Sequence, residues 1–177
     1  MLEKSKDLKN SKIILVGPGG CGKDYLCNYL LKNTNLKKAT SYTTRPIRDG
    51  EKSGEVYHFV SREEFERMIE NDEFYEWEEF IGWYYGSTKK TFEDSDIFIK
   101  TVGGIKNILP EDRKRCTIIY LDIDKGVRRE RLNKRNDADN TERRLLADDK
   151  DFENFIDFDI HITETFFKPE EILQKIS

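Results

Sequence analysis

The sequence predicts a three-layer α/β fold in which a parallel core sheet is flanked by helices. Four short apolar runs have the composition of strands buried on both faces, and segments of helical or lid character separate them. The runs are Lys12–Val16, Ile97–Val102, Thr117–Leu121 and Ile160–Thr163. Strands that alternate with helices along a chain of 177 residues indicate a single domain of parallel strands joined by helical crossovers.

The first strand is followed by a glycine cluster and then by a helix. Tyr25, Leu26, Tyr29 and Leu30 recur at helical spacing directly after the glycines. The chain therefore predicts a tight strand-to-helix turn over residues 17–23.

Residues 41–88 break this alternation and predict a small mixed α+β insertion. Ser61 and Glu64 form a capping box, and the apolar residues that follow them give one face of a helix. Phe74–Phe80 then predicts a strand. Because this segment carries three glutamates, we expect one of its faces to be exposed to solvent.

A basic segment from Lys125 to Arg144 predicts a mobile helix–loop–helix. It contains eight basic residues, and a polar stretch at 136–140 separates its two halves. A solvated charged face is the alternative interpretation. The chain then divides into a core (11–40, 89–125 and 145–177), an inserted subdomain (41–88) and a basic segment (126–144).

Composition and charge exclude several classes of protein. The 31 basic and 35 acidic side chains give a net charge of −4, so the overall charge indicates neither a nucleic-acid partner nor an anionic membrane. Three cysteines without CxxC spacing predict neither a disulfide framework nor a zinc site. The first twelve residues resemble no secretory signal, and the aliphatic runs are too short to span a bilayer. We therefore expect a cytoplasmic protein.

The glycine cluster has the pattern GxxxxGK between a predicted strand and a predicted helix, as a phosphate-binding loop requires. Its glycines allow backbone N–H groups to turn toward phosphate oxygens, the helix N-terminus adds positive potential, and Lys23 would reach the β- and γ-phosphates. A glycine-rich turn without a ligand is the alternative, but it would leave Lys23 at a helix start, where the helix dipole disfavours cations. The expected ATP-binding residues are Gly17, Pro18, Gly19, Gly20, Cys21, Gly22, Lys23 and Asp24.

Asp24 departs from the loop pattern, which has a Ser or Thr hydroxyl for Mg²⁺ at this position. A carboxylate can ligate Mg²⁺ directly, and we take Asp24 as the candidate metal ligand. Helix capping is the alternative role, and a negative charge beside phosphates would weaken nucleotide binding.

Four segments after the loop, in this order, are similar to the guanylate kinase family. They are SYTTRPIRDGE at 41–51, GEVYHFV at 54–60, EFYEW at 73–77 and YYGST at 84–88. The similarity is dense from about residue 13 to 88 and can be traced more weakly to the C-terminus. It implies a P-loop NTPase fold with an inserted subdomain that binds the acceptor nucleoside monophosphate and a helical lid.

The resemblance implies roles for the acceptor phosphate. Arg45 and Arg48 match the family's arginines that grip this phosphate, a task suited to bidentate guanidinium groups. Tyr57 and Tyr85 match the tyrosines whose hydroxyls complete the phosphate site. An exposed ion pair and aromatic core packing are the alternative readings.

The resemblance also implies roles for the acceptor base. Glu76 matches the carboxylate that accepts from guanine N1–H and the 2-amino group, a pair of donors that adenine does not present. Ser41 and Ser87 match the hydroxyl contacts to the base. A solvent-exposed strand face is the alternative reading of Glu76.

The basic segment at 126–144 resembles the family's lid, whose arginines close over the ATP phosphates. Arg131, Arg135 and Arg144 are the candidates, and with Lys23 and Arg45 they form the expected catalytic set. This segment is about two residues shorter than the family's lid. The resemblance therefore assigns the three arginines to the lid as a group and does not give each one a separate role.

A second departure lies on the strand at 97–102, where the family carries Asp-x-Asp. Ile99 and Thr101 stand at the two acidic positions. Thr101 is kept as a candidate contact to the acceptor nucleoside, and base recognition is expected to depend mainly on Glu76.

The expected function is ATP-dependent phosphorylation of GMP or dGMP, with Mg²⁺ arriving with ATP. The expected partners are ATP and GMP or dGMP, with neither nucleic acid nor membrane, and the protein is expected to be a monomer or a homodimer. Two alternatives remain: a kinase with a different base preference, and a binding module without turnover, which the changes at Asp24, Ile99 and Thr101 would favour.

Overall fold

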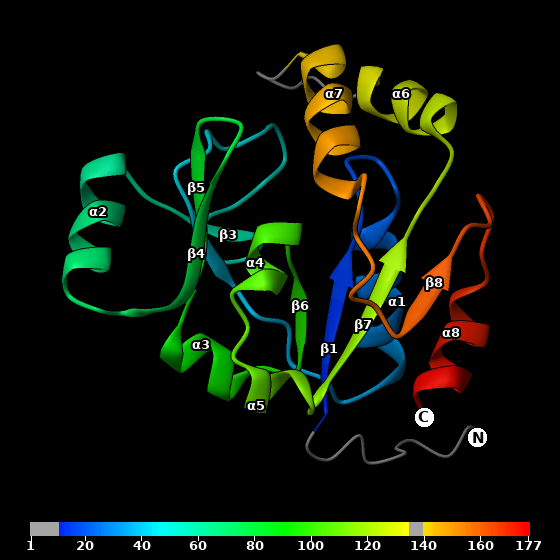
Figure 1. The fold of residues 1–177 in the computed structure, drawn as a ribbon, viewed down its shortest axis with the longest axis horizontal. Coiled ribbons are helices and arrows are strands. Elements are labelled where there is room, and N and C mark those ends of the chain that lie inside the picture. Colours follow the sequence, from blue (N-terminus) through cyan, green and yellow to red (C-terminus); the bar gives the residue numbers. More distant parts are fainter. Residues whose placement is uncertain (1–10, 135–139) are drawn as a thin grey trace.

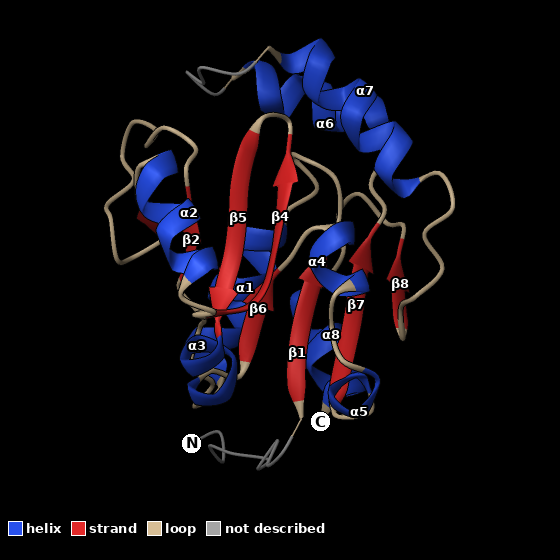
Figure 2. Ribbon diagram, turned by 60° about the vertical axis from the view of Figure 1, so that its left-hand side comes forward, coloured by secondary structure: helices blue, strands red, loops and turns tan. Residues whose placement is uncertain are grey.

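The computed structural model describes residues 11–134 and 140–177, and a parallel sheet lies at its centre. This core sheet has the order β6 (Ile97–Ile99), β1 (Lys12–Val16), β7 (Cys116–Leu121) and β8 (Ile160–Ile162). All of its neighbouring strands run parallel, as Figures 1 and 2 show. The predicted α/β class is confirmed.

One expected strand is shorter than its apolar run. β6 ends at Ile99, although the Lys100 amide still donates to Leu15 O at 3.0 Å. Thr101 is the N-cap of α4 (Val102–Lys106), and its hydroxyl accepts from Gly104 N at 3.1 Å. A side-chain cap thus turns the chain into a helix before the apolar run ends.

Helices cover both faces of the core sheet. On one face α1 (Lys23–Asn33) and α8 (Pro169–Ile176) pack against alternate residues of β1, among them Ile13 and Leu15. On the other face α3 (Lys89–Asp94), α4 and the residues that precede α5 (Pro110–Arg113) pack against Ile14 and Val16. β1 is buried along its whole length, as its unbroken apolar run predicts.

The insertion is a second sheet with one helix. Its strand order is β3 (Tyr57–Phe59), β2 (Ser41–Thr43), β5 (Trp83–Thr88) and β4 (Phe74–Phe80), in a mixture of parallel and antiparallel pairs. α2 (Arg62–Glu70) begins at the predicted cap, where the Ser61 side chain accepts from Glu64 N. Phe65 of α2 stacks on Phe74 and Tyr84, which fixes the helix to the sheet.

One face of β4 is exposed to solvent, as expected, but it carries only one of the three glutamates. Glu76 is buried and Glu78 is half-buried, whereas Trp77 between them is exposed. The reason is tertiary: β4 lies against α4, and Gly103 there has no side chain where Glu78 packs. Glu79 is exposed, as expected.

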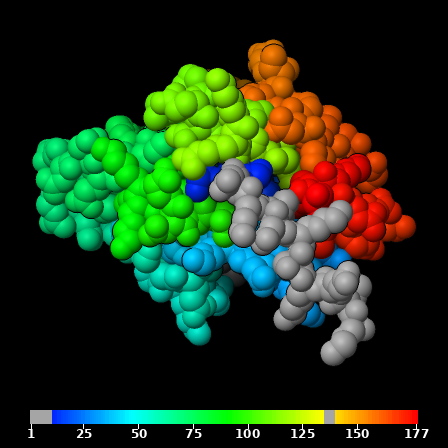
Figure 3. All heavy atoms as spheres, turned by 90° about the horizontal axis from the view of Figure 1, so that it is seen from below, coloured from blue at the N-terminus to red at the C-terminus, as the bar shows by residue number. Residues whose placement is uncertain are grey.

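The basic segment forms two helices above the carboxyl ends of the core strands. They are α6 (Lys125–Asn133) and α7 (Thr141–Phe152), capped by the side chains of Asp124 and Asn140. α7 continues as one helix past residue 144, where the expected lid ends. Seen from below, the insertion (teal and green) and the C-terminal residues (orange and red) form opposite ends of the molecule (Figure 3). Within 11–134 and 140–177, no helix has the length and apolar character needed to cross a membrane.

Candidate active site

A cavity of about 730 Å³ lies at the carboxyl ends of the core strands, between the glycine loop, the insertion and α7. This is the end of a parallel sheet where α/β proteins bind ligands. Most candidate residues line it: Gly17, Gly19, Gly20, Gly22, Lys23, Asp24, Ser41, Arg45, Arg48, Tyr57, Glu76, Tyr85, Thr101, Arg131 and Arg144. Pro18, Cys21 and Ser87 are buried and are not part of its lining, and Arg135 lies outside the described residues.

The glycine loop has a backbone path that side chains would obstruct. A Cβ atom at Gly17 would lie 2.5 Å from Leu121 O, so the loop passes directly against β7. Gly22, the N-cap of α1, has φ 102°, a left-handed conformation that favours glycine. The loop and the N-terminus of α1 therefore line the cavity, an arrangement suited to an anionic ligand.

The ammonium group of Lys23 lies over this loop. Its Nζ donates to Gly17 O at 2.5 Å and to Pro18 O at 3.1 Å. A positive charge is thus held beside the same backbone that would surround phosphate oxygens. The geometry suits a side chain that exchanges carbonyl partners for phosphate.

Asp148 of α7 makes a contact with the loop that sequence reasoning missed. Gly19 N donates to Asp148 Oδ2 at 2.8 Å, and the carboxylate is almost fully buried. Arg128 of α6, also buried, lies 3.6 Å from the same oxygen. Nothing in the local sequence of α7 distinguishes Asp148 from the neighbouring Asp149, because the contact joins residues 129 positions apart.

Arg45 is held at the opposite side of the cavity by Glu51. Its Nη2 donates to both carboxylate oxygens, at 2.9 and 3.0 Å, and its guanidinium lies against the rings of Tyr57 and Phe59. Burial would raise the pKa of Glu51, but hydrogen bonds from Arg45 and the Arg48 amide, with the charges of both arginines, lower that pKa instead. Glu51 thus orients the first arginine. The spacing Arg-x-x-Arg-x-x-Glu was the signal that could have found it.

Tyr57 and Tyr85 stand side by side in the cavity wall, with ring centroids 6.0 Å apart. Burial is the largest cause that raises the pKa of each hydroxyl. Both phenols therefore keep their protons at neutral pH and can donate to an anionic group.

A connected polar network closes the cavity between the insertion and β6. The Lys100 ammonium contacts Glu76 Oε1 and donates to Ser87 Oγ at 3.2 Å. Ser87 Oγ lies 3.0 Å from Ser41 Oγ. The expected base contacts Ser41, Glu76 and Ser87 are therefore brought together. Sequence reasoning assigned no role to Lys100, although a charged residue directly after an apolar strand was a usable signal.

Comparisons with known proteins agree with this geometry. The chain matches the guanylate kinase family over residues 9–176. The protein belongs to the guanylate kinase family. It is 36% identical over 137 residues to a guanylate kinase of Pseudoalteromonas translucida and 47% identical over 121 residues to one of Aster yellows witches'-broom phytoplasma. These matches cover 72% and 64% of this chain but 65% and 57% of the relatives, so the chain spans less than two thirds of their length.

A solved structure shows the same fold. The crystal structure of guanylate kinase from Anaplasma phagocytophilum aligns with a TM-score of 0.70 and 26% identity. The alignment covers 94% of this chain and 82% of the other. The overall fold is therefore shared with a guanylate kinase.

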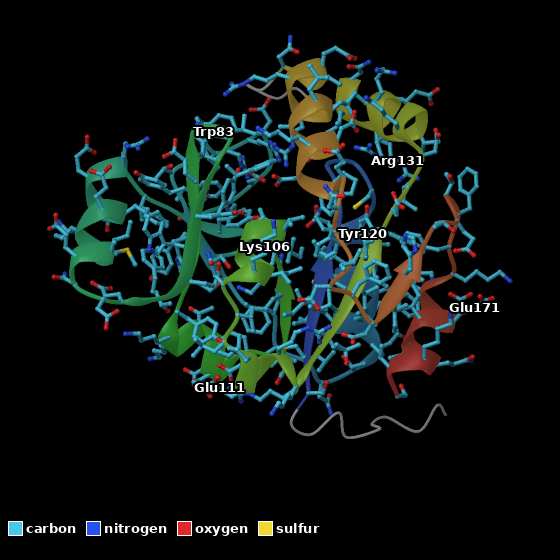
Figure 4. All side chains as sticks on the ribbon, viewed as in Figure 1. Trp83, Lys106, Glu111, Tyr120, Arg131 and Glu171 are labelled. Atoms are coloured by element: carbon cyan, nitrogen blue, oxygen red, sulfur yellow. The ribbon has the colours of Figure 1, made fainter. Side chains whose placement is uncertain are left out.

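Within this guanylate kinase fold, one arginine of α6 and one of α7 lie at the glycine loop. Arg131 Nη1 donates to Gly20 O at 3.0 Å, and Figure 4 shows Arg131 on α6 beside the loop. The Arg144 guanidinium lies 5.8 Å from the Phe80 ring, and a Cβ atom at Gly19 would approach Arg144 Nε to 3.0 Å. Two guanidinium groups thus converge on the glycine loop from α6 and α7.

Asp24 is the candidate ligand for Mg²⁺ among the described residues. Asp24 is exposed in the first turn of α1 and lines the cavity. Across 11–134 and 140–177, His, Cys, Asp and Glu side chains nowhere form a group of three that could hold a metal ion. Mg²⁺ is commonly bound by one or two carboxylates, substrate phosphates and water. The exposed carboxylate of Asp24 in the cavity lining fits that mode.

Proposed function

We propose that the protein transfers the γ-phosphoryl group of ATP to GMP or dGMP. One observation carries this proposal: a single cavity is lined both by the glycine loop with Lys23 and by Ser41, Lys100 and Glu76 of the polar network. Phosphoryl transfer requires a donor and an acceptor in line, and the loop and the insertion supply one side each.

The chain's own residues would bind, orient and neutralise charge. Lys23 and the loop amides would hold the donor phosphates, and Arg131 and Arg144 would stabilise charge on the transferred group. Arg45 and Arg48 would bind the acceptor phosphate, with the protonated hydroxyls of Tyr57 and Tyr85 as further donors. Thr101 lines the same cavity and is retained as an acceptor contact.

Mg²⁺, when bound with ATP, would neutralise charge on the phosphates. Asp24 would be the protein ligand. We further propose a cytoplasmic location, because the cytoplasm supplies both nucleotides, and a monomer or homodimer that needs neither nucleic acid nor membrane.

A coupled assay with ATP and Mg²⁺ against GMP, dGMP, AMP, CMP and UMP tests the function. We expect turnover with GMP and dGMP and little with the other acceptors. Preferred turnover of another base would establish the alternative kinase. Nucleotide binding with no turnover of any acceptor would establish the binding module.

A further inference from the structure

The closed end of the cavity contains a lysine that no part of the proposed reaction has yet used. Lys100 follows β6 at the carboxyl edge of the core sheet, and its side chain is as deeply buried as that of Glu76. We propose that Lys100 is a specificity-determining residue, whose ammonium group donates to the 6-oxo group of the acceptor purine while Glu76 accepts from N1–H and the 2-amino group. This inference rests on the proposed function.

The position of Lys100 is set independently of its charge. Its backbone N–H donates to Leu15 O, which extends the pairing of β6 with β1 by one residue. The side chain then enters the space between the two sheets, where Glu76 Oε1 and Ser87 Oγ take its hydrogen bonds. Its Nζ lies 5.2 Å from the centre of the Phe98 ring, so apolar surface supports the aliphatic stem.

The pair Lys100–Glu76 is neutral as a unit and presents a donor beside an acceptor. Both residues line the cavity. An ammonium group has three N–H donors, and the two described contacts, to Glu76 and Ser87, leave one that can turn to a base. A neutral base with an acceptor next to two donors matches this arrangement, and guanine has that edge.

Adenine would meet two mismatches at the same pair. Its 6-amino group would face the ammonium, donor against donor, and its unprotonated N1 would face the carboxylate, acceptor against acceptor. Unpaired buried polar groups discriminate strongly between substrates. A carboxylate alone would supply only the second mismatch, so Lys100 doubles the penalty for the wrong purine.

The experiment measures the affinities for GMP and for 6-thio-GMP by calorimetry at mildly acidic pH. The analogue has a sulfur, a poor hydrogen-bond acceptor, in place of the 6-oxo oxygen, and the quantity of interest is the ratio of the two affinities. Wild-type protein is expected to bind GMP about tenfold more tightly than the thio analogue. Lys100→Met should reduce that ratio to near one, and Lys100→Arg, which retains a charged donor, should restore part of it. Lys106→Met is the matched control, because Lys106 is an exposed lysine on α4 (Figure 4) and should preserve the ratio.

A lysine that only compensates the charge of Glu76 gives a different result. Lys100→Met would then weaken binding of both nucleotides by the same factor and leave the ratio unchanged, which overturns the proposal, as does a wild-type ratio of one. If Lys100→Met does not fold, the double variant with Lys100→Met and Glu76→Gln, which removes both charges, is measured instead. If that variant keeps the wild-type ratio of GMP affinity to 6-thio-GMP affinity, the proposal is overturned.

Measuring nucleotide binding and turnover separately distinguishes the proposed kinase activity from the proposed role of Lys100. A wild-type protein that binds GMP with the expected ratio but never phosphorylates it contradicts the proposed function and supports the role of Lys100. If the wild-type protein phosphorylates GMP but Lys100→Met leaves the affinity ratio unchanged, the proposed function is supported and the role of Lys100 is contradicted. Failure to bind either nucleotide contradicts both.

Discussion

Asp148 Oδ2 accepts a hydrogen bond from Gly19 N at 2.8 Å, so a buried carboxylate of α7 bonds to an amide of the phosphate-binding loop. Loop amides of this kind are the donors that hold phosphate oxygens. A negative group on one of these donors competes with an anionic ligand, and its charge disfavours a phosphate nearby. The same carboxylate lies beside Arg128, which offsets part of its charge.

Asp148→Asn should therefore strengthen ATP binding by about tenfold, because the variant removes a charge that opposes the phosphates. It should also lower the free energy of unfolding by about 1–3 kcal/mol, because Arg128 loses its buried partner. Calorimetric titration with ATP and urea unfolding measure the two effects. Asp149→Asn is the control, since Asp149 is more exposed on the same helix. Unchanged or weaker ATP binding in Asp148→Asn would show that the carboxylate supports the loop rather than competing with phosphate.

Lys23→Ala should remove nearly all turnover and leave the fold intact. The ammonium contacts only carbonyl oxygens and Cys21 Sγ in the described structure, so its loss breaks no buried ion pair there. We expect kcat to fall by more than about a hundredfold with a similar melting temperature. Lys32→Ala, an exposed lysine on the same helix, should retain activity. Comparable turnover in Lys23→Ala would show that the loop is not the donor site.

Glu76→Gln should raise the KM for GMP and reduce discrimination against AMP. The amide loses a charge-assisted hydrogen bond and presents a donor to a donor-rich edge, at a cost of about 2–4 kcal/mol in kcat/KM. Steady-state kinetics with both nucleotides measure the change. A variant with unaltered base preference would mean that guanine is recognised elsewhere or is not the acceptor.

Asp24→Ser tests the metal assignment. If Asp24 ligates Mg²⁺ directly, serine is a weaker ligand, and the Mg²⁺ concentration for half-maximal rate should increase about three- to tenfold at fixed ATP. We expect this outcome, because the exposed carboxylate lines the cavity beside the loop. A lower requirement in the variant would refute direct ligation and show that the charge of Asp24 repels the phosphates.

Glu78 should make stability depend on pH. Burial, followed by the charges of Asp151 and Glu76, raises the pKa of Glu78 from 4.5 to about 7. Between these values the folded protein retains a proton that the unfolded chain has lost, so stability falls as pH rises from 4.5 to 7.

Glu78→Gln should remove the loss of folding stability that the ionisation of Glu78 causes as pH rises. Allowing for solvent screening of a half-buried group, we expect it to stabilise the protein by about 1–2 kcal/mol at pH above 7 and hardly at all below pH 4.5. Urea unfolding across this pH range measures the difference in the free energy of unfolding between variant and wild type. Glu79→Gln is the control, because Glu79 is the exposed neighbour of Glu78. A stabilisation independent of pH would exclude titration of Glu78 as the cause.

Local signals were enough to predict most of the fold and the glycine loop that lines the cavity. The cap at Ser61, the buried strand at 12–16 and the turn over 17–23 each depend on residues within one or two turns of chain. Hydrophobic periodicity, a capping side chain and glycines in a tight turn are properties of such short segments. Strand β6 shows the limit of hydrophobic periodicity as a predictor of strand ends. The apolar run continues to Val102, but the hydroxyl of Thr101 caps α4 and the strand stops before it.

Sequence therefore established the P-loop α/β architecture, the glycine loop and the order of the acceptor motifs, since each is encoded over a few neighbouring residues. Tertiary packing established which side of β4 is buried, the pairing of Glu76 with Lys100 and the contact of Asp148 with Gly19. These contacts join residues 24 and 129 positions apart. The charge of a side chain can be read in a sequence, but its partner and its desolvation depend on which distant elements the fold brings against it.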